Sequence, residues 1–301
     1  MSNVLETKIM GVTLKNPVIA ASGTFGFGEE YSEYTDVSRL GGISGKGLTL
    51  NGSKGNDGIR IYESASGLMN SIGLENPGVE VFVKEKCAVM RKMNTAIIAN
   101  LGGHSLEDYI SGVEMLDSAD IDILELNISC PNVKKGGMSF GTDPKFAGEL
   151  VARLRKLTTK PLLVKLTPNA PDIVAVAKAC EDNGADGVSL INTLLGMAID
   201  VKRKKAVFNN VYAGFSGPAV MPVALRMVHQ VAHSVKIPVV GMGGITSTED
   251  ALAFMMAGAS AIQVGTATFY DPDAMVKIIQ GLEDYAIENK LNNISEIVGI
   301  V

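Results

Sequence analysis

One cysteine stands between two asparagines, just past a run of residues that is typical of a buried strand. In ELNISCPN, residues 125–132, the polar side chains at the tip are those of Asn127, Ser129, Cys130 and Asn132. A free cysteine is often only a small buried hydrophobe, and we expect this of Cys87 and Cys180, which lie in helical patterns. Cys130 instead precedes the glycine-rich stretch GGMSFG, which predicts a loop. Its thiol is therefore a candidate nucleophile or proton-transfer group.

Glycines follow two later apolar runs, in the stretches GMGG (241–244) and VGT (264–266). Glycine lets backbone N–H groups approach an anion closely, and the amino end of a helix favours negative charge. Tight turns without a ligand would also use glycine here. Because both stretches are glycine-rich, we favour a phosphate site at Gly243, Gly244, Gly265 and Thr266.

Two lysines, Lys46 and Lys165, end otherwise apolar runs. Either could be a Schiff-base nucleophile or a fixed positive charge that faces an anionic ligand. A lysine whose ammonium group merely reaches the rim is the simplest alternative. Because a lysine is almost never fully buried without a partner, two of them in such positions favour an anionic or electron-accepting ligand.

The three histidines do not suggest a metal site or a hydrolase. His104, His229 and His233 do not cluster with acids or cysteines at ligand spacing, and the sequence contains no CxxC motif. His229 and His233 lie four residues apart in one helical pattern, where surface or packing roles are expected. We therefore predict no bound metal and no Ser-His-acid hydrolysis.

The candidate residues share one place in the pattern, at or just past the carboxyl end of a short apolar run. The eight runs are PVIAASG (17–23), GGISGKG (41–47), TAIIANLG (95–102), ILELNIS (123–129), PLLVKLTP (161–168), GVSLINT (187–193), PVVGMGGI (238–245) and AIQVGTA (261–267). Helical segments lie between them, with N-cap signals at Ser105, Asp143, Asp172 and Ser247. Nearly continuous apolar strands that alternate with helices predict an α/β fold of the (β/α)8 TIM-barrel type. A doubly wound open parallel sheet is the alternative.

Two long insertions follow predicted strands, residues 48–75 after the second and residues 194–216 after the sixth. Loops of this length at the carboxyl ends of barrel strands are usually functional. The segment VLETKIMGVTLKN, residues 4–16, predicts an N-terminal β-hairpin that plugs the other end of the barrel. No linker or change of composition appears, so residues 1–301 are expected to form one domain.

The amino-acid composition argues against nucleic acid and membranes as partners. The 301 residues are 46% apolar and carry a net charge of −5, so a basic surface for nucleic acid is not expected. No stretch approaches the roughly 20 apolar residues that cross a membrane, and no signal peptide is recognisable. Three widely spaced cysteines indicate a reducing compartment, so we expect a cytoplasmic protein that does not associate with membranes.

Several motifs taken together resemble the class 1 dihydroorotate dehydrogenases, and in detail the catalytic subunit of the B type. They are ASGTFGFGEEY, LMNSIGLENPG, ELNISCPN with GGMSFGTDP, INT, FSGPA, GMGGI and VGTA, in this order along almost the whole chain. The resemblance implies oxidation of dihydroorotate to orotate in de novo pyrimidine (UMP) biosynthesis. It also implies one FMN, a cofactor that fits the anionic, electron-accepting ligand inferred from the lysines and glycines.

The resemblance assigns roles residue by residue. Contacts with FMN are implied for Ser22, Lys46, Gly47, Asn100, Asn127, Lys165, Ile191, Gly217, Gly243, Gly244, Gly265 and Thr266, the last four and Gly217 at its phosphate. Contacts with dihydroorotate are implied for Lys46, Asn70, Ser71, Ile72, Gly73, Leu74, Asn127, Asn132, Asn192 and Thr193. Cys130 would be the general base that takes the proton from C5 while hydride leaves C6. Gly136, Gly137 and Gly141 would let its loop close over the substrate.

The electron acceptor distinguishes the B type from its rivals. The chain has no cysteine cluster for an iron–sulfur centre and no second dinucleotide-binding pattern. The B type implies a homodimer bound to two partner subunits that carry FAD and a 2Fe-2S cluster and pass electrons to NAD. The A type implies fumarate as acceptor and no partner subunit. Other rivals are a dihydropyrimidine or dihydrouridine flavin oxidoreductase, a flavin-free aldolase and a non-catalytic assembly barrel.

Overall fold

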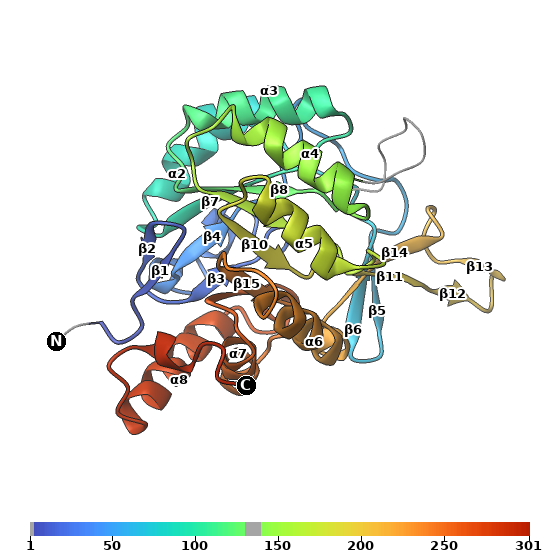
Figure 1. Cartoon of the computed structure of the whole chain (residues 1–301). Helices are drawn as coiled ribbons and strands as arrows, with labels where there is room; N and C mark the ends of the chain where they lie inside the picture. Colours follow the sequence, from blue (N-terminus) through green and yellow to red (C-terminus); the bar gives the residue numbers. More distant parts are fainter. Residues whose placement is uncertain (1–2, 130–139) are drawn as a thin grey trace.

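Eight parallel strands close into a barrel in the order β10-β15-β16-β3-β4-β7-β8-β9 (Figure 1). The computed structural model describes residues 3–129 and 140–301. The barrel strands are β3 (Val18–Ala20), β4 (Gly42–Ser44), β7 (Ala96–Leu101), β8 (Ile123–Asn127), β9 (Leu162–Lys165), β10 (Gly187–Leu190), β15 (Val239–Met242) and β16 (Ala261–Val264). Each lies within one of the eight predicted runs, so the predicted barrel is confirmed and the open sheet is wrong.

Helices cover the outside of the barrel. They are α1 (Val79–Val81), which continues through a π-helical turn (Phe82–Lys86) into α2 (Cys87–Arg91), then α3 (Leu106–Asp117), α4 (Pro144–Arg155), α5 (Ile173–Asp182), α6 (Met221–Ala232), α7 (Thr248–Met256) and α8 (Ala274–Glu288). All four predicted N-caps accept backbone hydrogen bonds from the first turn of their helices. None of the helices in the described residues is long and apolar enough to cross a membrane.

The first strand is followed by two short 3-10 turns, η1 (Glu29–Tyr31) and η2 (Val37–Arg39), where the simple strand-helix alternation predicts an α-helix. Three glycines in this segment, Gly23, Gly26 and Gly28, have positive φ angles. Such angles interrupt a right-handed helix, and glycine is the residue that adopts them readily. The other single-turn 3-10 segments are η4 (Pro218–Val220), η5 (Thr266–Phe269) and η6 (Ile294–Ile297).

The predicted N-terminal hairpin is present and closes the amino end of the barrel. Strands β1 (Thr7–Ile9) and β2 (Val12–Leu14) pair antiparallel. Ile9 and Leu14 are buried in one cluster with side chains from six barrel strands: Ile19, Ile98, Ile123, Leu163, Val240 and Ala261. This dry apolar layer leaves the opposite, carboxyl end of the barrel as the open mouth.

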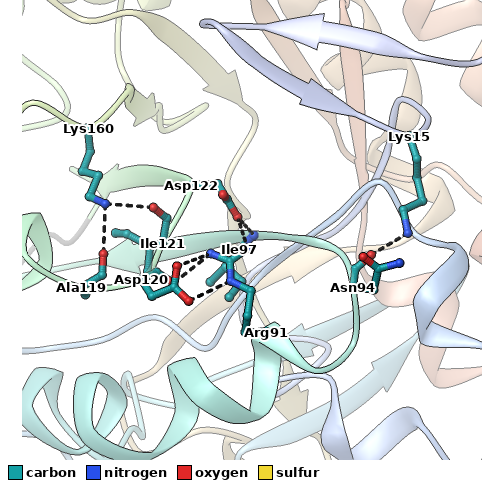
Figure 2. A network of polar contacts seen from close by, with 9 residues as sticks. All are labelled: Lys15, Arg91, Asn94, Ile97, Ala119, Asp120, Ile121, Asp122 and Lys160. Carbon is teal, nitrogen blue, oxygen red and sulfur yellow. Dashed lines mark hydrogen bonds and ion pairs between the residues drawn. The ribbon is translucent and has the colours of Figure 1, made fainter.

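A polar network ties the amino ends of the strands to the surrounding loops (Figure 2). Arg91 makes ion pairs with Asp120 at 2.9 Å and with Asp122 at 3.0 Å. Asp122 also accepts a hydrogen bond from the backbone N–H of Ile97, at the start of β7. Lys160 donates to the carbonyl oxygens of Ala119 and Ile121. Because the network lies away from the mouth, its role is to fix the strand entries.

The two long insertions meet in one four-stranded antiparallel sheet, in the order β11-β14-β6-β5. Its strands are β5 (Ile61–Ser64), β6 (Gly67–Asn70), β11 (Leu194–Met197) and β14 (Tyr212–Ser216). A further hairpin, β12 (Ile199–Asp200) and β13 (Lys205–Ala206), extends away from the barrel in Figure 1. Met69 and Ala213 of this sheet form a small buried core with Phe208. The pairing brings Asn70 next to Gly214 and thus places residues of both insertions at the mouth.

Candidate active site

The barrel interior changes from apolar to polar one level above the hairpin plug. At this level the side chains are those of Ser44, Asn100, Glu125, Lys165, Ser189 and Gln263, each at most 5% exposed. Barrel interiors are usually filled by branched apolar residues, so a buried polar layer at this depth needs a reason other than packing. The layer lies directly beneath the mouth and supports the residues at its floor.

Glu125 is the centre of the polar layer and is fully buried. One carboxylate oxygen, Oε2, accepts hydrogen bonds from Ser44 Oγ and Asn100 Nδ2, each at 2.7 Å. The other, Oε1, accepts from Ser189 Oγ at 2.7 Å and from Gln263 Nε2 at 3.0 Å. Four donors match the acceptor capacity of an ionised carboxylate. The layer is therefore built around one negative charge.

Lys165, at the end of β9, is the positive counterpart of Glu125. Burial raises the pKa of the Glu125 carboxyl, but the Lys165 cation and the hydrogen bonds outweigh this, so the net shift is downward. Burial lowers the pKa of the Lys165 ammonium, and Glu125 opposes that change. Lys165 is 5% exposed, and its ammonium group makes no hydrogen bond with any described residue. The alternative of a lysine that reaches the rim does not fit this burial.

Asn100 turns its other amide atom away from Glu125. Its Oδ1 is buried and has no hydrogen-bond partner among the described residues. A Cβ atom placed on Gly47 would lie 3.0 Å from this oxygen, 3.5 Å from the Leu74 side chain and 3.7 Å from Ser22 Oγ. Four of the predicted site residues, Ser22, Gly47, Leu74 and Asn100, thus meet at one point. A buried acceptor without a donor is costly, so a ligand donor at this point would be favourable.

The asparagines predicted for the substrate also come together. Asn192 Nδ2 donates to Asn127 Oδ1 at 3.3 Å, and the carbonyl oxygen of Asn127 accepts from Tyr109 OH at 2.7 Å. A Cβ on Gly214 would lie 2.4 Å from Thr193 Oγ1 and 3.3 Å from Asn70 Nδ2, which places these two side chains close together. Amide groups that offer both donors and acceptors line this part of the mouth.

The stretch that follows Asn70 is held in shape by local contacts. Ser71 Oγ accepts a hydrogen bond from Asn56 Nδ2 at 3.0 Å, and the Ile72 carbonyl oxygen accepts from the Asn56 N–H at 3.0 Å. Gly73 and Leu74 have positive φ angles of 75° and 52°. The backbone therefore turns sharply here, which brings Leu74 back to Gly47.

Glycines form a cradle at the strand tips of β14, β15 and β16. A Cβ on Gly244 would lie 2.9 Å from the Gly217 carbonyl oxygen and 2.9 Å from the Met221 N atom, at the start of α6. Gly243 lies against Ile191, and Gly265 lies against Ala21. Thr266 Oγ1 donates to Ser216 Oγ at 2.8 Å, which links the tips of β16 and β14. Of the predicted phosphate residues, Gly217 and Gly244 are thus in direct contact, and Thr266 is linked to the strand that precedes Gly217.

Three predicted features lie apart from these contacts or outside the described residues. Lys46 is half-buried and lines a cleft with Gly26, Glu30 and Glu75. Cys130, Asn132, Gly136 and Gly137 lie outside the described residues, so their predicted roles stay predictions. Gly141 packs against the Ile128 carbonyl oxygen, and a Cβ on Gly141 would lie 2.5 Å from that oxygen.

In the parts of the chain that the structure describes, no group of three or more His, Cys, Asp or Glu residues could hold a metal.

A family model described as dihydroorotate dehydrogenase matches residues 4–285. The chain belongs to the dihydroorotate dehydrogenase family. It is 50% identical over 300 residues to the catalytic subunit of dihydroorotate dehydrogenase B (NAD(+)) from Petrotoga mobilis, covering 99% of this chain and 100% of that protein. The subunit of the same name from Alkaliphilus metalliredigens is 52% identical over 295 residues, which are 98% of each chain. The resemblance inferred from the motifs is thus confirmed.

One residue of the site was missed by sequence reasoning. Glu125 stands inside ELNISCPN, but the motif drew attention to its polar tip and not to the acid in its strand. The available signal was an acid in an otherwise apolar run that is buried on both faces. Such an acid is almost never buried without partners. Its partners are spread over five other strands, however, so they could not be found from spacing along the chain.

Proposed function

We propose that this member of the dihydroorotate dehydrogenase family oxidises dihydroorotate to orotate in pyrimidine (UMP) biosynthesis, as one domain that binds one FMN. The observation that carries the proposal is the convergence of three features at the barrel mouth. These are the buried cation of Lys165, the unpaired Oδ1 of Asn100 and the glycine cradle around Gly244. They supply, in turn, a charge, an acceptor and a phosphate cradle.

The residues present fit FMN. Its phosphate would lie in the cradle of Gly217, Gly243, Gly244, Gly265 and Thr266, where backbone N–H groups and the amino end of α6 favour an anion. Asn100 Oδ1 would accept from a donor of the cofactor, with Ser22 and Gly47 beside it. Asn127 and Ile191 are proposed as further contacts of the cofactor. Lys165 would offset negative charge that the cofactor gains, as preorganised electrostatic stabilisation. Bound FMN would supply the acceptor for the hydride that leaves C6 of dihydroorotate.

Dihydroorotate would be held by the amide groups at the mouth. The ring carries N–H donors and carbonyl acceptors, and asparagine side chains match both kinds of group. The contact between Asn127 and Asn192 fixes how each of these amides points. The residues proposed to hold the substrate are Lys46, Asn70, Ser71, Ile72, Gly73, Leu74, Asn127, Asn132, Asn192 and Thr193.

Cys130 is proposed as the general base that removes the proton from C5. Its position lies outside the described residues, so the proposal rests on the motif that contains it. The other two thiols are unsuited to this task, because burial raises the pKa of Cys87 to about 11 and that of Cys180 to about 12. Both would stay protonated in a reducing cytoplasm, where we infer that the protein works.

We further propose that NAD is the final acceptor and that a partner subunit with FAD and a 2Fe-2S cluster transfers the electrons. Support comes from the names of the relatives, which are catalytic subunits of an NAD(+) enzyme.

For the homodimer contact we propose the insertion sheet, which exposes apolar side chains: Leu195 is 64% exposed, Met197 46% and Tyr212 57%. Met197 lies opposite Tyr212 in the sheet register, so they share one face. Exposed apolar patches of this kind mark subunit contacts, and we assign this one to the contact between two copies of the chain in the homodimer.

The test is anaerobic reduction followed by a choice of acceptors. The purified chain is loaded with FMN and mixed with dihydroorotate, which should bleach the flavin absorbance. NAD+ should restore the colour only when the FAD/2Fe-2S partner subunit is added. Rapid recovery with fumarate and no partner would replace the B-type proposal by the A-type one. A preparation that takes up no FMN would favour the flavin-free aldolase or the assembly barrel instead.

A further inference from the structure

We propose that Glu125 is a positioning residue of the reaction. Its fixed negative charge keeps the Lys165 side chain cationic and aims the side-chain oxygen of Asn100, Oδ1, into the mouth. The inference deepens the proposed function and rests on it, because it concerns the groups that would face FMN. Glu125 is not itself a catalytic residue: it lies one level below the mouth and acts through its neighbours.

The charge of the Lys165 side chain depends on Glu125. A buried ammonium group without a counter-charge loses its proton readily, because burial disfavours the charged form. Lys165 is the register partner of Asn127, which lies two residues past Glu125 on the neighbouring strand, so both side chains lie in the same buried layer. Among the described residues, Glu125 is the charged group that opposes this effect on Lys165. The other side chains around the carboxylate, those of Ser44, Asn100, Ser189 and Gln263, are uncharged. Lys46, at the tip of β4, is the other lysine proposed at the mouth, and it lines a cleft together with Glu30 and Glu75. The cation under the cofactor site thus depends on one carboxylate.

Glu125 also fixes the direction in which the Asn100 amide points. The Asn100 amide donates to Glu125 through Nδ2 at 2.7 Å, so its Oδ1 must point to the other side. That side is the mouth, where Gly47 and Ser22 lie. If the carboxylate were absent, the amide could turn over and present its NH2 group instead. The same carboxylate therefore fixes both the charge of Lys165 and the acceptor that Asn100 offers.

The Glu125 carboxylate tolerates full burial because four donors surround it. Its four hydrogen bonds come from β4, β7, β10 and β16, and each donor is buried as well. A buried charge is stable only when it is paired and hydrogen-bonded. A purely structural layer could use apolar residues of similar size and avoid this cost. The polar layer is therefore explained by the groups that it presents to the mouth.

The test variant is Glu125→Gln, which keeps the shape of the side chain and removes its charge. Lys165 is followed by NMR of ¹³C-labelled lysine side chains in the FMN-free protein, and its signal is assigned with Lys165→Met. We expect the titration midpoint of Lys165 to move to lower pH in Glu125→Gln. After FMN loading, the rate of reduction by dihydroorotate should stay near that of the wild type at low pH and fall as pH rises. Above the new midpoint, each further pH unit lowers the fraction of Lys165 that is charged about tenfold.

Two further variants separate charge from structure. Ser189→Ala removes one hydrogen bond from the same carboxylate and keeps its charge, so the Lys165 midpoint should move little. Glu125→Gln combined with Gln263→Glu exchanges a carboxylate and an amide that are in contact at 3.0 Å. This exchange should restore much of the Lys165 midpoint, because a carboxylate returns to the layer. Should Glu125→Gln not fold, the exchange variant still tests the role of the charge, because Lys165 should keep a midpoint near that of the wild type when the carboxylate stands at position 263.

The outcomes are distinct. An unchanged Lys165 midpoint in folded Glu125→Gln, or a loss of rate that is equal at all pH values, would overturn the proposal and leave Glu125 a structural residue. An exchange variant that folds but leaves Lys165 uncharged would do the same. The NMR titration needs no cofactor, so it stands even if the wild-type protein binds no FMN. In that case the proposed function fails while the coupling of Glu125 to Lys165 is still decided.

Discussion

Glu125 and Asn100 are paired twice, once through the sheet register of β8 and β7 and once through a side-chain hydrogen bond of 2.7 Å. The backbone pairing sets the two side chains at the same height in the barrel, and the hydrogen bond then decides which end of the Asn100 amide faces upward. The floor of the mouth is thus fixed by strands and not by loops. Sites built on strands hold their groups more precisely than sites on loops.

Gly244→Ala is expected to weaken FMN binding. Gly244 has a φ of 80°, and its new Cβ would collide with Met221 and with the Gly217 carbonyl oxygen. The matched control is Gly11→Ala, because Gly11 has a φ of 81° and open space around its Cβ position. Both changes should cost about 1–2 kcal/mol of stability for the left-handed backbone. Fluorescence titration with FMN should show a loss of affinity of tenfold or more for Gly244→Ala only. Equal affinities in the two variants would remove Gly244 from the phosphate cradle.

Cys130→Ser is expected to keep FMN and to lose most oxidation of dihydroorotate at neutral pH. A serine hydroxyl ionises far less readily than a thiol, whose usual pKa is about 8.5. Residual activity should therefore rise with pH, as stopped-flow reduction across a pH series would show. The buried thiols supply the controls, since Cys87→Ser and Cys180→Ala should leave turnover close to that of the wild type. Wild-type rates in Cys130→Ser at neutral pH would exclude this thiol from the mechanism.

Leu195→Glu is expected to weaken self-association. Leu195 is 64% exposed on β11, on the apolar face that we assign to the homodimer. Ile287→Glu is the matched control, because Ile287 is also 64% exposed but lies on α8. Light scattering after size-exclusion chromatography should show a smaller species for Leu195→Glu and an unchanged one for Ile287→Glu. The assignment is wrong if Leu195→Glu associates as strongly as the wild type.

Asp117→Asn is expected to lower stability at neutral pH and to have little effect in acid. Hydrogen bonds from Thr158 and from the Thr159 N–H lower the pKa of Asp117 in the folded protein. A lowered folded-state pKa gives a stabilisation that is present above the unfolded pKa and is lost as pH falls through the folded one. The difference in melting temperature between wild type and variant should therefore shrink as the pH is lowered. Asp284→Asn, at an exposed position of α8, serves as the comparison. A difference that is constant with pH would mean that the charge of Asp117 is not involved.

Much of the architecture could be predicted from the sequence, because the signals are local. Continuous apolar runs such as PLLVKLTP and caps such as Ser105 and Ser247 are properties of a few neighbouring residues. The glycines at 243, 244 and 265 were recognisable in the same way, because small residues at strand ends leave room for a ligand. The motif ELNISCPN indicates the family through the types and order of its eight residues alone.

Tertiary structure decided what depends on distant partners. The two insertions pair as β6 and β14, with Asn70 next to Gly214, and no local pattern specifies that register. In the sequence Glu125 only interrupts an apolar run, and barrel closure is what brings Ser44, Ser189 and Gln263 to its carboxylate. Local propensity fixes strands and turns, because it acts between neighbours in the chain. A buried charge is instead stabilised by donors from remote strands, and these come together only when the sheet closes on itself.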